Sequence, residues 1–327
     1  MSNVLSVPAE KYPMKMLPAY KDYLWGGERL IADYNKSGDI RPMAESWEVS
    51  CHPDGLSYIQ NGVYKGCSLS DVLSAHPGFM GGARSGNDFP ILIKLIDAYK
   101  DLSLQVHPDD VYAMEIEKQQ GKNEMWYVLE AKPDAALILG FKNQISESEL
   151  RRRIADNTLL ECVNRVPIKA GDCFCIPAGM LHAIGAGALI VEVQQNSNIT
   201  YRVYDYGRLD ANGNERELHI NSAVNVIDSS IKAENCSQNR CKNLSGYKSF
   251  QLTDWKYFSS SCLVIDTHAD LFISPENFSC IICAEGSPSL IWNDGEITLN
   301  KGESCFLPAG MGEYSIKGSC KLITAEA

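Results

Sequence analysis

The sequence predicts a mainly β protein with a few short helices, in which the strands pack as sandwiches or barrels. Two observations support this fold class: the spacing of apolar stretches and an internal repeat. Short apolar stretches, many with β-branched residues, recur along the 327 residues and are separated by Gly, Pro, Asn or Asp. Stretches of this length and composition are typical of strands. The clearest predicted strands lie at residues 91–96, 102–106, 125–129, 136–139, 173–176, 189–193, 280–283, 289–292 and 304–307.

The internal repeat joins residues 171–182 with residues 302–313, which align without gaps. Each copy begins with Gly and an acidic residue, continues through a short apolar stretch and reaches Pro-Ala-Gly-Met. A repeated turn–strand–turn unit predicts two related barrels in one chain. The first copy ends with His182, whereas the second has Glu313 at that position, so we expect only the first barrel to bind a metal ion.

Four short helices are predicted between the strands. Ser146 and Glu149 form the pattern of a capping box, and Pro108 with the two aspartates after it suits a helix N-terminus. The basic run at residues 151–153 is interpreted as a solvated helix face and is not assigned to a site. The predicted helices lie near residues 68–73, 108–119, 146–154 and 221–227.

Composition and charge argue against several classes of function. The formal net charge is −11, which disfavours non-specific nucleic-acid binding. An anionic substrate would therefore need a local group of cations. No apolar run is long enough to span a membrane, and the N-terminal residues lack the apolar core of a secretory signal, so we expect a cytoplasmic protein. The 12 cysteines form no paired zinc-binding pattern and are interpreted mainly as small buried residues.

Four residues in three segments have the chemistry of a metal site. Gln105 and His107 lie two apart in an apparent strand, so both side chains point to one face. Glu124 directly precedes the next predicted strand, and His182 ends the first copy of the repeat. Two imidazoles, one carboxylate and one amide oxygen suit Zn²⁺ or another borderline divalent ion. With one anionic ligand, such a site would keep net positive charge and polarise a substrate oxygen.

The residues alone leave the metal site open. A single His in a strand is more often a core or surface residue than a ligand, and a Gln in a strand is usually an ordinary polar contact. The pattern His-Pro-Asp-Asp at residues 107–110 and the pattern Pro-x-Gly-x-x-His at residues 177–182 are suggestive, but they do not decide between these interpretations.

Seven segments, in order along the chain, closely resemble class I mannose-6-phosphate isomerases, especially their short bacterial form. The resemblance depends on Gln-x-His-Pro, Lys-x-Glu and Pro-x-Gly-x-x-His elements that occur in one order. The C-terminal third matches less by motif than by the repeat. The matching segments are residues 20–27, 45–50, 92–96, 102–110, 121–126, 176–182 and 191–205.

The resemblance implies a cupin-type fold that holds one zinc ion. It extends the predicted fold to two cupin-type, jelly-roll β-barrels, with the few short helices inserted in the N-terminal catalytic half. We expect a catalytic domain at residues 1–240 and a degenerate cupin-like domain without metal ligands at residues 241–327. A polar segment at residues 228–243 is the candidate linker between them.

The resemblance also implies roles for individual residues. One position departs from the family pattern, because this chain has Asn198 where relatives usually have an acidic residue, and no proton-transfer role is assigned to it. The expected zinc ligands are Gln105, His107, Glu124 and His182. The other expected site residues are Ser103 and Lys94 for the phosphate group of the substrate, and Lys122, Glu192 and Arg202 for catalysis.

The implied reaction is the reversible conversion of mannose 6-phosphate into fructose 6-phosphate through an enediol. Glu192 is the candidate base and Lys122 is the alternative, so the base stays unassigned. Arg202 would offer the phosphate a forked, always-charged set of donors, although an ion pair with Asp205 or Glu192 is another interpretation. For Lys94, the alternative is a side chain that extends along the surface.

Two other functions remain open. An iron-dependent oxygenase of the cupin type would use two histidines and one carboxylate with open coordination positions. A non-catalytic sugar-phosphate-binding cupin protein would keep the pocket without turnover. For the isomerase we expect one zinc ion per chain, a small sugar phosphate as the partner, no nucleic acid or membrane, and a monomer or small homo-oligomer.

Overall fold

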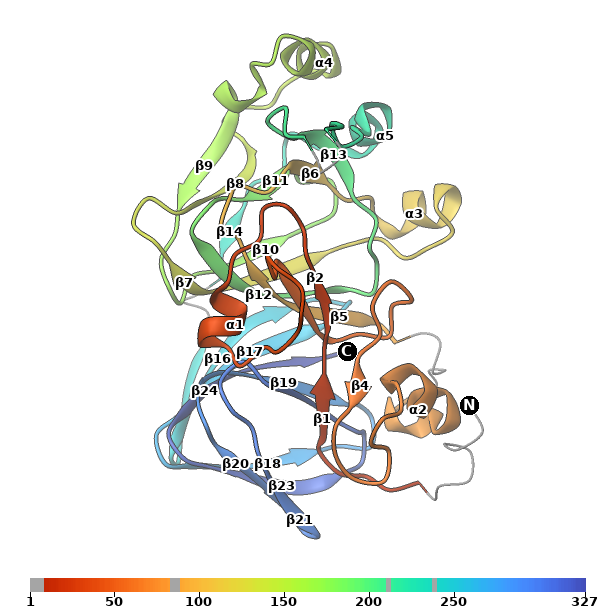
Figure 1. Cartoon of the computed structure of the whole chain (residues 1–327), viewed down its shortest axis with the longest axis vertical. Coiled ribbons are helices and arrows are strands. Elements are labelled where there is room, and N and C mark those ends of the chain that lie inside the picture. Colours follow the sequence, from red (N-terminus) through yellow and green to blue (C-terminus); the bar gives the residue numbers. More distant parts are fainter. Residues whose placement is uncertain (1–8, 83–88, 210–212, 237–239) are drawn as a thin grey trace.

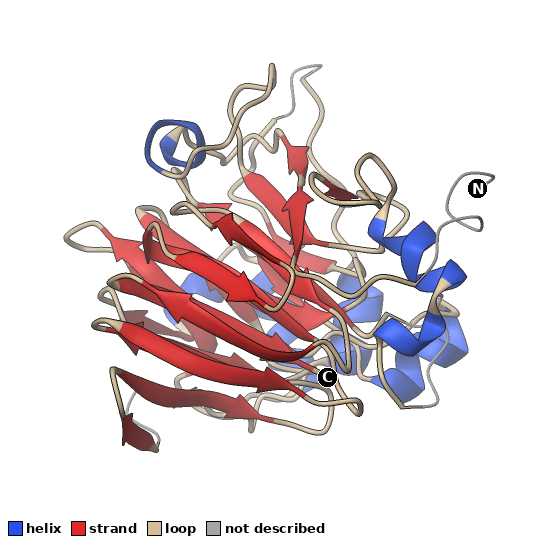
Figure 2. Ribbon diagram, turned by 90° about the horizontal axis from the view of Figure 1, so that it is seen from below, coloured by secondary structure: helices blue, strands red, loops and turns tan. Residues whose placement is uncertain are grey.

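Short apolar strands assemble into four β-sheets, which stack in layers along the long axis of the molecule (Figure 1). The computed structural model describes residues 9–82, 89–209, 213–236 and 240–327. The sheets have five, seven, eight and four strands, in that order through the stack. Figure 2 shows the sheets lying over one another, with the helices at the periphery.

The first two layers contain most of the N-terminal part of the chain. The order in the five-stranded sheet is β13 (Tyr201–Tyr204), β6 (Leu104–Val106), β11 (His182–Ile184), β8 (Ala136–Phe141) and β9 (Val163–Pro167). The order in the seven-stranded sheet is β14 (Glu234–Asn235), β10 (Cys173–Ile176), β7 (Glu124–Ala131), β12 (Ala188–Gln195), β5 (Ile91–Asp97), β3 (Glu45–Val49) and β2 (Ala19–Lys21).

The other two layers contain the C-terminal part and two N-terminal strands. The order in the eight-stranded sheet is β15 (Cys241–Leu244), β16 (Tyr247–Asp254), β17 (Ser259–Ile265), β24 (Cys320–Glu326), β19 (Ser279–Gly286), β22 (Ser304–Leu307), β1 (Met14–Leu17) and β4 (Tyr58–Ile59). The order in the four-stranded sheet is β18 (His268–Ile273), β23 (Gly312–Lys317), β20 (Ser289–Trp292) and β21 (Gly295–Thr298).

Three hydrophobic cores lie between the four layers. Because successive residues of a strand point to opposite faces, one strand can contribute to two cores. The seven-stranded sheet is covered on both faces, and its strands β5 and β12 are therefore buried along their whole length. Representative pairs are Leu139 and Ile190 between the five- and seven-stranded sheets, Val191 and Ile282 between the seven- and eight-stranded sheets, and Ile281 and Ile316 between the eight- and four-stranded sheets.

The helices are short and lie outside the sheets, and a fourth hydrophobic core packs some of them against the five-stranded sheet (Figure 1). Asp109 and Ser146 cap their helices, because their side chains accept hydrogen bonds from the backbone N–H groups of Tyr112 and Glu149. No helix in the described ranges is both long and apolar enough to cross a lipid bilayer. The α-helices are α1 (Arg29–Asp33), α2 (Leu69–Ala75), α3 (Asp110–Ile116), α4 (Glu147–Ala155) and α5 (Ile220–Val226).

The structure confirms the mainly β class, every strand singled out in the sequence and the four predicted helices. The two copies of the repeat form equivalent strands, β10 and β22, each followed by a turn whose glycine, Gly179 or Gly310, has a positive φ. None of the four sheets closes on itself, so closed barrels are not observed. The predicted linker contributes β14 to the seven-stranded sheet and the first residues of β15 to the eight-stranded sheet, while residues 237–239 lie outside the described ranges.

A substitution of Phe306 can test the packing of the core between the seven- and eight-stranded sheets. It is fully buried, contacts the rings of Phe89 and Phe278, and pairs across strands with Met14, so it also joins the two ends of the chain. We expect Phe306→Ala to lower the free energy of unfolding by about 3–5 kcal/mol, measured by chemical denaturation.

Phe272→Ala is the matched control, because the Phe272 side chain is 62% exposed. This variant should change the free energy of unfolding by less than about 0.5 kcal/mol. Similar losses for the two variants would contradict the layered packing.

Candidate active site

A row of cross-strand neighbours crosses the face of the seven-stranded sheet that is turned toward the five-stranded sheet. Lys94 of β5 is opposite Glu192 of β12, Glu192 is opposite Trp126 of β7, and Trp126 is opposite Phe174 of β10. Directly opposed residues on paired strands point to the same face. The register therefore places a lysine, a carboxylate and an indole side by side.

A second row lies on the five-stranded sheet. Arg202 of β13 is opposite Gln105 of β6, and Gln105 is opposite His182 of β11. His107 follows Gln105 by two residues and so lies on the same face. The two rows face each other across the gap between the sheets, because Glu124, at the start of β7, contacts both histidines.

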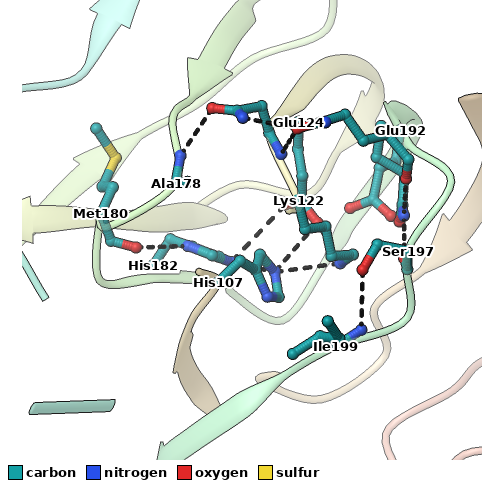
Figure 3. Close-up of polar contacts among 12 residues, drawn as sticks. His107, Lys122, Glu124, Ala178, Met180, His182, Glu192, Ser197 and Ile199 are labelled. Atoms are coloured by element: carbon teal, nitrogen blue, oxygen red, sulfur yellow. Dashed lines mark hydrogen bonds and ion pairs between the residues drawn. The ribbon is translucent and has the colours of Figure 1, made fainter. Parts of the chain in front are cut away.

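Three side chains converge at this gap, as Figure 3 shows. His107 Nε2 lies 3.1 Å from His182 Nε2 and 3.1 Å from Glu124 Oε1, and His182 Nε2 lies 3.8 Å from Glu124 Oε2. Donor atoms bound at 2.0–2.1 Å to one tetrahedral zinc ion are about 3.4 Å apart. These separations therefore fit donors that share one cation.

The protonation states of the three side chains also suit a cation. Burial lowers the pKa of His107 to about 3, and the charge of Lys122 is the second cause of this shift. Burial also lowers the pKa of His182. Both rings are therefore neutral. The His182 Nδ1–H donates to the Met180 carbonyl oxygen at 2.8 Å, which leaves the Nε2 lone pair directed at the cluster. Glu124 Oε2 is buried without a hydrogen-bond donor among the described residues.

Lys122 connects this cluster to its surroundings. Its ammonium group forms a short ion pair with Glu124 Oε1 and lies 3.1 Å from His107 Nε2. Burial alone would raise the pKa of Glu124, but the charge of Lys122 and the hydrogen bond with His107 hold that pKa well below its usual value. The carboxylate is therefore ionised, as a metal ligand must be.

A cavity of about 270 Å³ adjoins the cluster. Its volume approaches the lower end of the range for small-ligand pockets, about 300 Å³. Asn198 lies in its wall and donates a hydrogen bond to Asp54 Oδ2 at 2.8 Å. The structure thus brings the predicted residues together, because this wall also contains Lys94, Ser103, Gln105, Lys122, Glu192 and Arg202.

Glu192 is a buried carboxylate with two polar neighbours. The Trp126 Nε1–H donates to Glu192 Oε2 at 2.8 Å, and the ammonium group of Lys94 lies 3.2 Å from Oε1. Burial, reinforced by the negative charge of Glu124, raises the pKa of Glu192 above its ordinary value, although Lys94 opposes this shift. Such a carboxylate can exchange a proton closer to neutral pH than an exposed one.

The structure excludes two of the alternative interpretations. Lys94 is only 4% exposed, so it does not extend along the surface. Burial alone would lower the pKa of Lys94, but Glu45 and Glu192 raise it above the ordinary value. Arg202 donates from Nη1 to the Glu217 carbonyl oxygen at 2.8 Å, and among the described residues it forms no ion pair with Asp205 or Glu192.

Several residues of the cavity were not predicted. Glu45 accepts a hydrogen bond from Trp47 Nε1 at 2.7 Å and lies 3.8 Å from the ammonium group of Lys94. Its position at the start of residues 45–50, one of the segments that match the family, was the available signal. Arg216 also lies in the cavity wall, but no motif or strand pattern surrounds it in the sequence.

Two family models match the chain. The catalytic domain of type I phosphomannose isomerase matches residues 14–145, which include three of the four expected metal ligands. The cupin domain of mannose-6-phosphate isomerase matches residues 249–326, in the eight- and four-stranded sheets.

Similar proteins match over nearly the whole chain. Mannose-6-phosphate isomerase ManA of Bacillus subtilis is 36% identical, over 96% of this chain and 98% of its own. The probable mannose-6-phosphate isomerase GmuF of the same organism is 37% identical, over 95% and 98%. A crystal structure of mannose 6-phosphate isomerase from Bacillus subtilis superposes with a TM-score of 0.91 at 37% identity, over 97% of this chain and 99% of that chain. These matches confirm the resemblance found in the sequence: the chain belongs to the type I mannose-6-phosphate isomerase family.

Proposed function

We propose that this chain interconverts mannose 6-phosphate and fructose 6-phosphate by moving a proton between C2 and C1 through an enediol. The names of its relatives support this substrate. The observation that carries the proposal is that buried Glu192, with its raised pKa, and Lys122, which contacts the His/Glu/His cluster, line one cavity.

Gln105, His107, Glu124 and His182 would hold one Zn²⁺ ion. Nitrogen and oxygen donors with a single carboxylate favour zinc over calcium or magnesium, which prefer oxygen ligands. When bound, such an ion supplies Lewis-acid polarisation of the substrate oxygens at C1 and C2. Gln105 is assigned on its position directly opposite His182 and in the cavity wall.

Glu192 would act as the base that takes the proton from C2 of mannose 6-phosphate and returns it to C1. Its two oxygens differ, since Oε2 accepts from Trp126 and Oε1 faces the ammonium group of Lys94. These contacts fix the plane of the carboxylate, which is what a base needs to reach one carbon and then the next. Trp126 and Lys94 are therefore positioning residues for Glu192.

Lys122 would donate hydrogen bonds to the developing oxyanion of the enediol. Its side-chain nitrogen is already engaged by Glu124 Oε1 and lies 3.1 Å from His107 Nε2, so we prefer Glu192 over Lys122 as the base. Ser103, Lys94 and Arg202 line the same cavity and are proposed to contact the phosphate group. Lys94 contributes less, because Glu45 and Glu192 already balance its charge.

The five- and seven-stranded sheets are proposed to form one cupin-type jelly roll, and the eight- and four-stranded sheets a second one. Only the first is proposed to be catalytic. The equivalent strands β10 and β22 of the repeat support this interpretation. Glu313, which replaces the histidine in the second copy, is exposed on β23. The boundary near residue 240 stays a prediction, because β1 and β4 from the N-terminal part join the eight-stranded sheet.

Metal removal tests the proposed chemistry. Chelated protein should lose conversion of mannose 6-phosphate into fructose 6-phosphate in a coupled assay, and added Zn²⁺ should restore it, because polarisation of the substrate oxygens is lost with the ion. Full activity in protein shown by elemental analysis to be metal-free would reject the mechanism. Sugar-phosphate binding without turnover at any metal loading would select the non-catalytic alternative.

His182→Ala tests the metal ligands by a direct binding measurement. Losing a residue that only hydrogen-bonds to a metal ligand typically lowers the metal affinity by roughly 10- to 100-fold, and losing a ligand itself should lower it further. We therefore expect no stoichiometric zinc in the variant after dialysis. His268→Ala is the matched control, since His268 is partly exposed on β18 in the four-stranded sheet. Equal zinc content in the two variants would remove His182 from the site.

Glu192→Gln tests the base. This change keeps the shape of the side chain but removes the proton acceptor, so kcat should fall by about 10²- to 10⁴-fold while zinc content stays unchanged. In the unchanged protein the carboxylate must be ionised to act. Because burial raises the pKa of Glu192, kcat/KM should fall as the pH decreases through a value above 4.5. A variant with normal kcat would exclude Glu192 as the base.

A further inference from the structure

The cationic side chains of the cavity are unequally neutralised. Lys94 lies between the carboxylates of Glu45 and Glu192, and Lys122 is paired with Glu124. The positive charge of these two lysines is therefore matched by negative charge from the chain itself. An anionic substrate group gains most where cations exceed anions, and the remaining cations of the cavity wall are Arg202 and Arg216.

Beside Arg202 and Arg216 of the cavity wall lies one buried carboxylate that is held by two guanidinium groups. Asp205 is 5% exposed and pairs with both Arg208 and Arg216. Burial would raise the pKa of Asp205, but hydrogen bonds from the two arginines lower it, so it is ionised. Burial is the main cause that lowers the pKa of Arg202, and the nearby charge of Arg216 lowers it further. Arg202, Arg208 and Arg216 thus carry three positive charges, against the two negative charges of Asp205 and Glu217.

Arg216 is held rigidly by Asp205. Its Nε and Nη2 atoms donate to Asp205 Oδ2 and Oδ1 at 2.7 and 2.6 Å, which is the planar fork preferred by arginine and carboxylate. This fork uses one edge of the guanidinium group and fixes its plane, and Nη1 is not part of it. Arg216 also lies in the cavity wall, whereas the Asp205 carboxylate behind it is buried.

Arg202, which lines the same cavity, has one unsatisfied donor. Its Nη1 atom donates to the Glu217 carbonyl oxygen, but its Nε is buried without an acceptor among the described residues. A buried donor without a partner is unfavourable for the folded protein. Two like charges that line one cavity, one of them with an unsatisfied donor, are the arrangement expected where an anion binds.

We propose that Arg216 is a substrate-binding residue that, together with Arg202, binds the phosphate group of the sugar phosphate; this inference rests on the proposed function. Arg202 lies two strands away from His182 in the five-stranded sheet, which is about 10 Å at the usual strand spacing. The phosphate group binds at this distance from the His/Glu/His cluster, and the reacting carbons lie beside the cluster. Arg216 then selects phosphorylated over unphosphorylated sugars.

Arg216→Gln in the zinc-loaded, full-length protein tests this assignment. The KM for mannose 6-phosphate and the inhibition constant of inorganic phosphate should both rise by about 10- to 100-fold, the effect of one lost charged hydrogen bond. The kcat should change little, because the phosphate group is remote from the reacting carbons and its binding is the same in the ground and transition states. Any slow turnover of unphosphorylated mannose should be unaffected.

Two further variants control for charge and folding. Arg152→Gln removes one positive charge from the exposed surface of α4 and should leave both constants unchanged. Arg216→Lys keeps the charge but loses the fork, and should show a smaller rise than Arg216→Gln. Thermal unfolding of each variant, compared with that of the parent, separates a binding effect from loss of structure.

Binding of inorganic phosphate, measured by calorimetry, separates this inference from the proposed function. An active isomerase whose Arg216→Gln variant has the parent's KM and phosphate affinity overturns the assignment of Arg216 alone. A parent protein without isomerase activity overturns the proposed function. In that case, a loss of phosphate affinity confined to the Arg216 variants still supports the arginine pair, and an unchanged affinity overturns it.

Discussion

Glu124 and two neutral imidazole rings face one another across the gap between the five- and seven-stranded sheets, and this contact requires positive charge. Glu124 is fully buried, and a buried carboxylate without a cationic partner costs several kcal/mol. Lys122 provides part of the compensation, and a divalent ion would provide the rest. The candidate site therefore depends on how precisely the two sheets are held in register and at a fixed separation.

That precision comes from the layers on either side. In β12, Glu192 points to the site, whereas Val191 and Val193 on either side of it point into the core shared with the eight-stranded sheet. A close-packed interior resists displacement, so Glu192 cannot shift without moving that core. The eight-stranded sheet, which contains strand β22 of the second repeat copy, supports the site in this way.

The local parts of this structure could be predicted from the residues themselves, whereas the meeting of distant segments at the site was predicted from the family resemblance, and other long-range contacts were not predicted. Gln105 and His107 were found because alternation along a strand is a two-residue pattern. The pairing of Met14 with Phe306 was not predicted, because it depends on residues at opposite ends of the chain. Arg216 was missed for a related reason: its position is fixed by Asp205 in the folded chain, and the segment around it has no strand or helix period.

The arrangement of charge in the cavity suits a substrate with two different ends. Lys94 and Lys122 are matched by carboxylates, so the pKa of Glu192 is set by a balance between burial, which raises it, and Lys94, which lowers it. Arg202 and Arg216 also line the cavity, and together with the neighbouring Arg208 they exceed the negative charges of Asp205 and Glu217. In a chain with a net charge of −11, this local excess of positive charge is where an anionic group would be attracted. A sugar phosphate entering this cavity would be oriented by its charged end before its carbonyl end reaches the cluster.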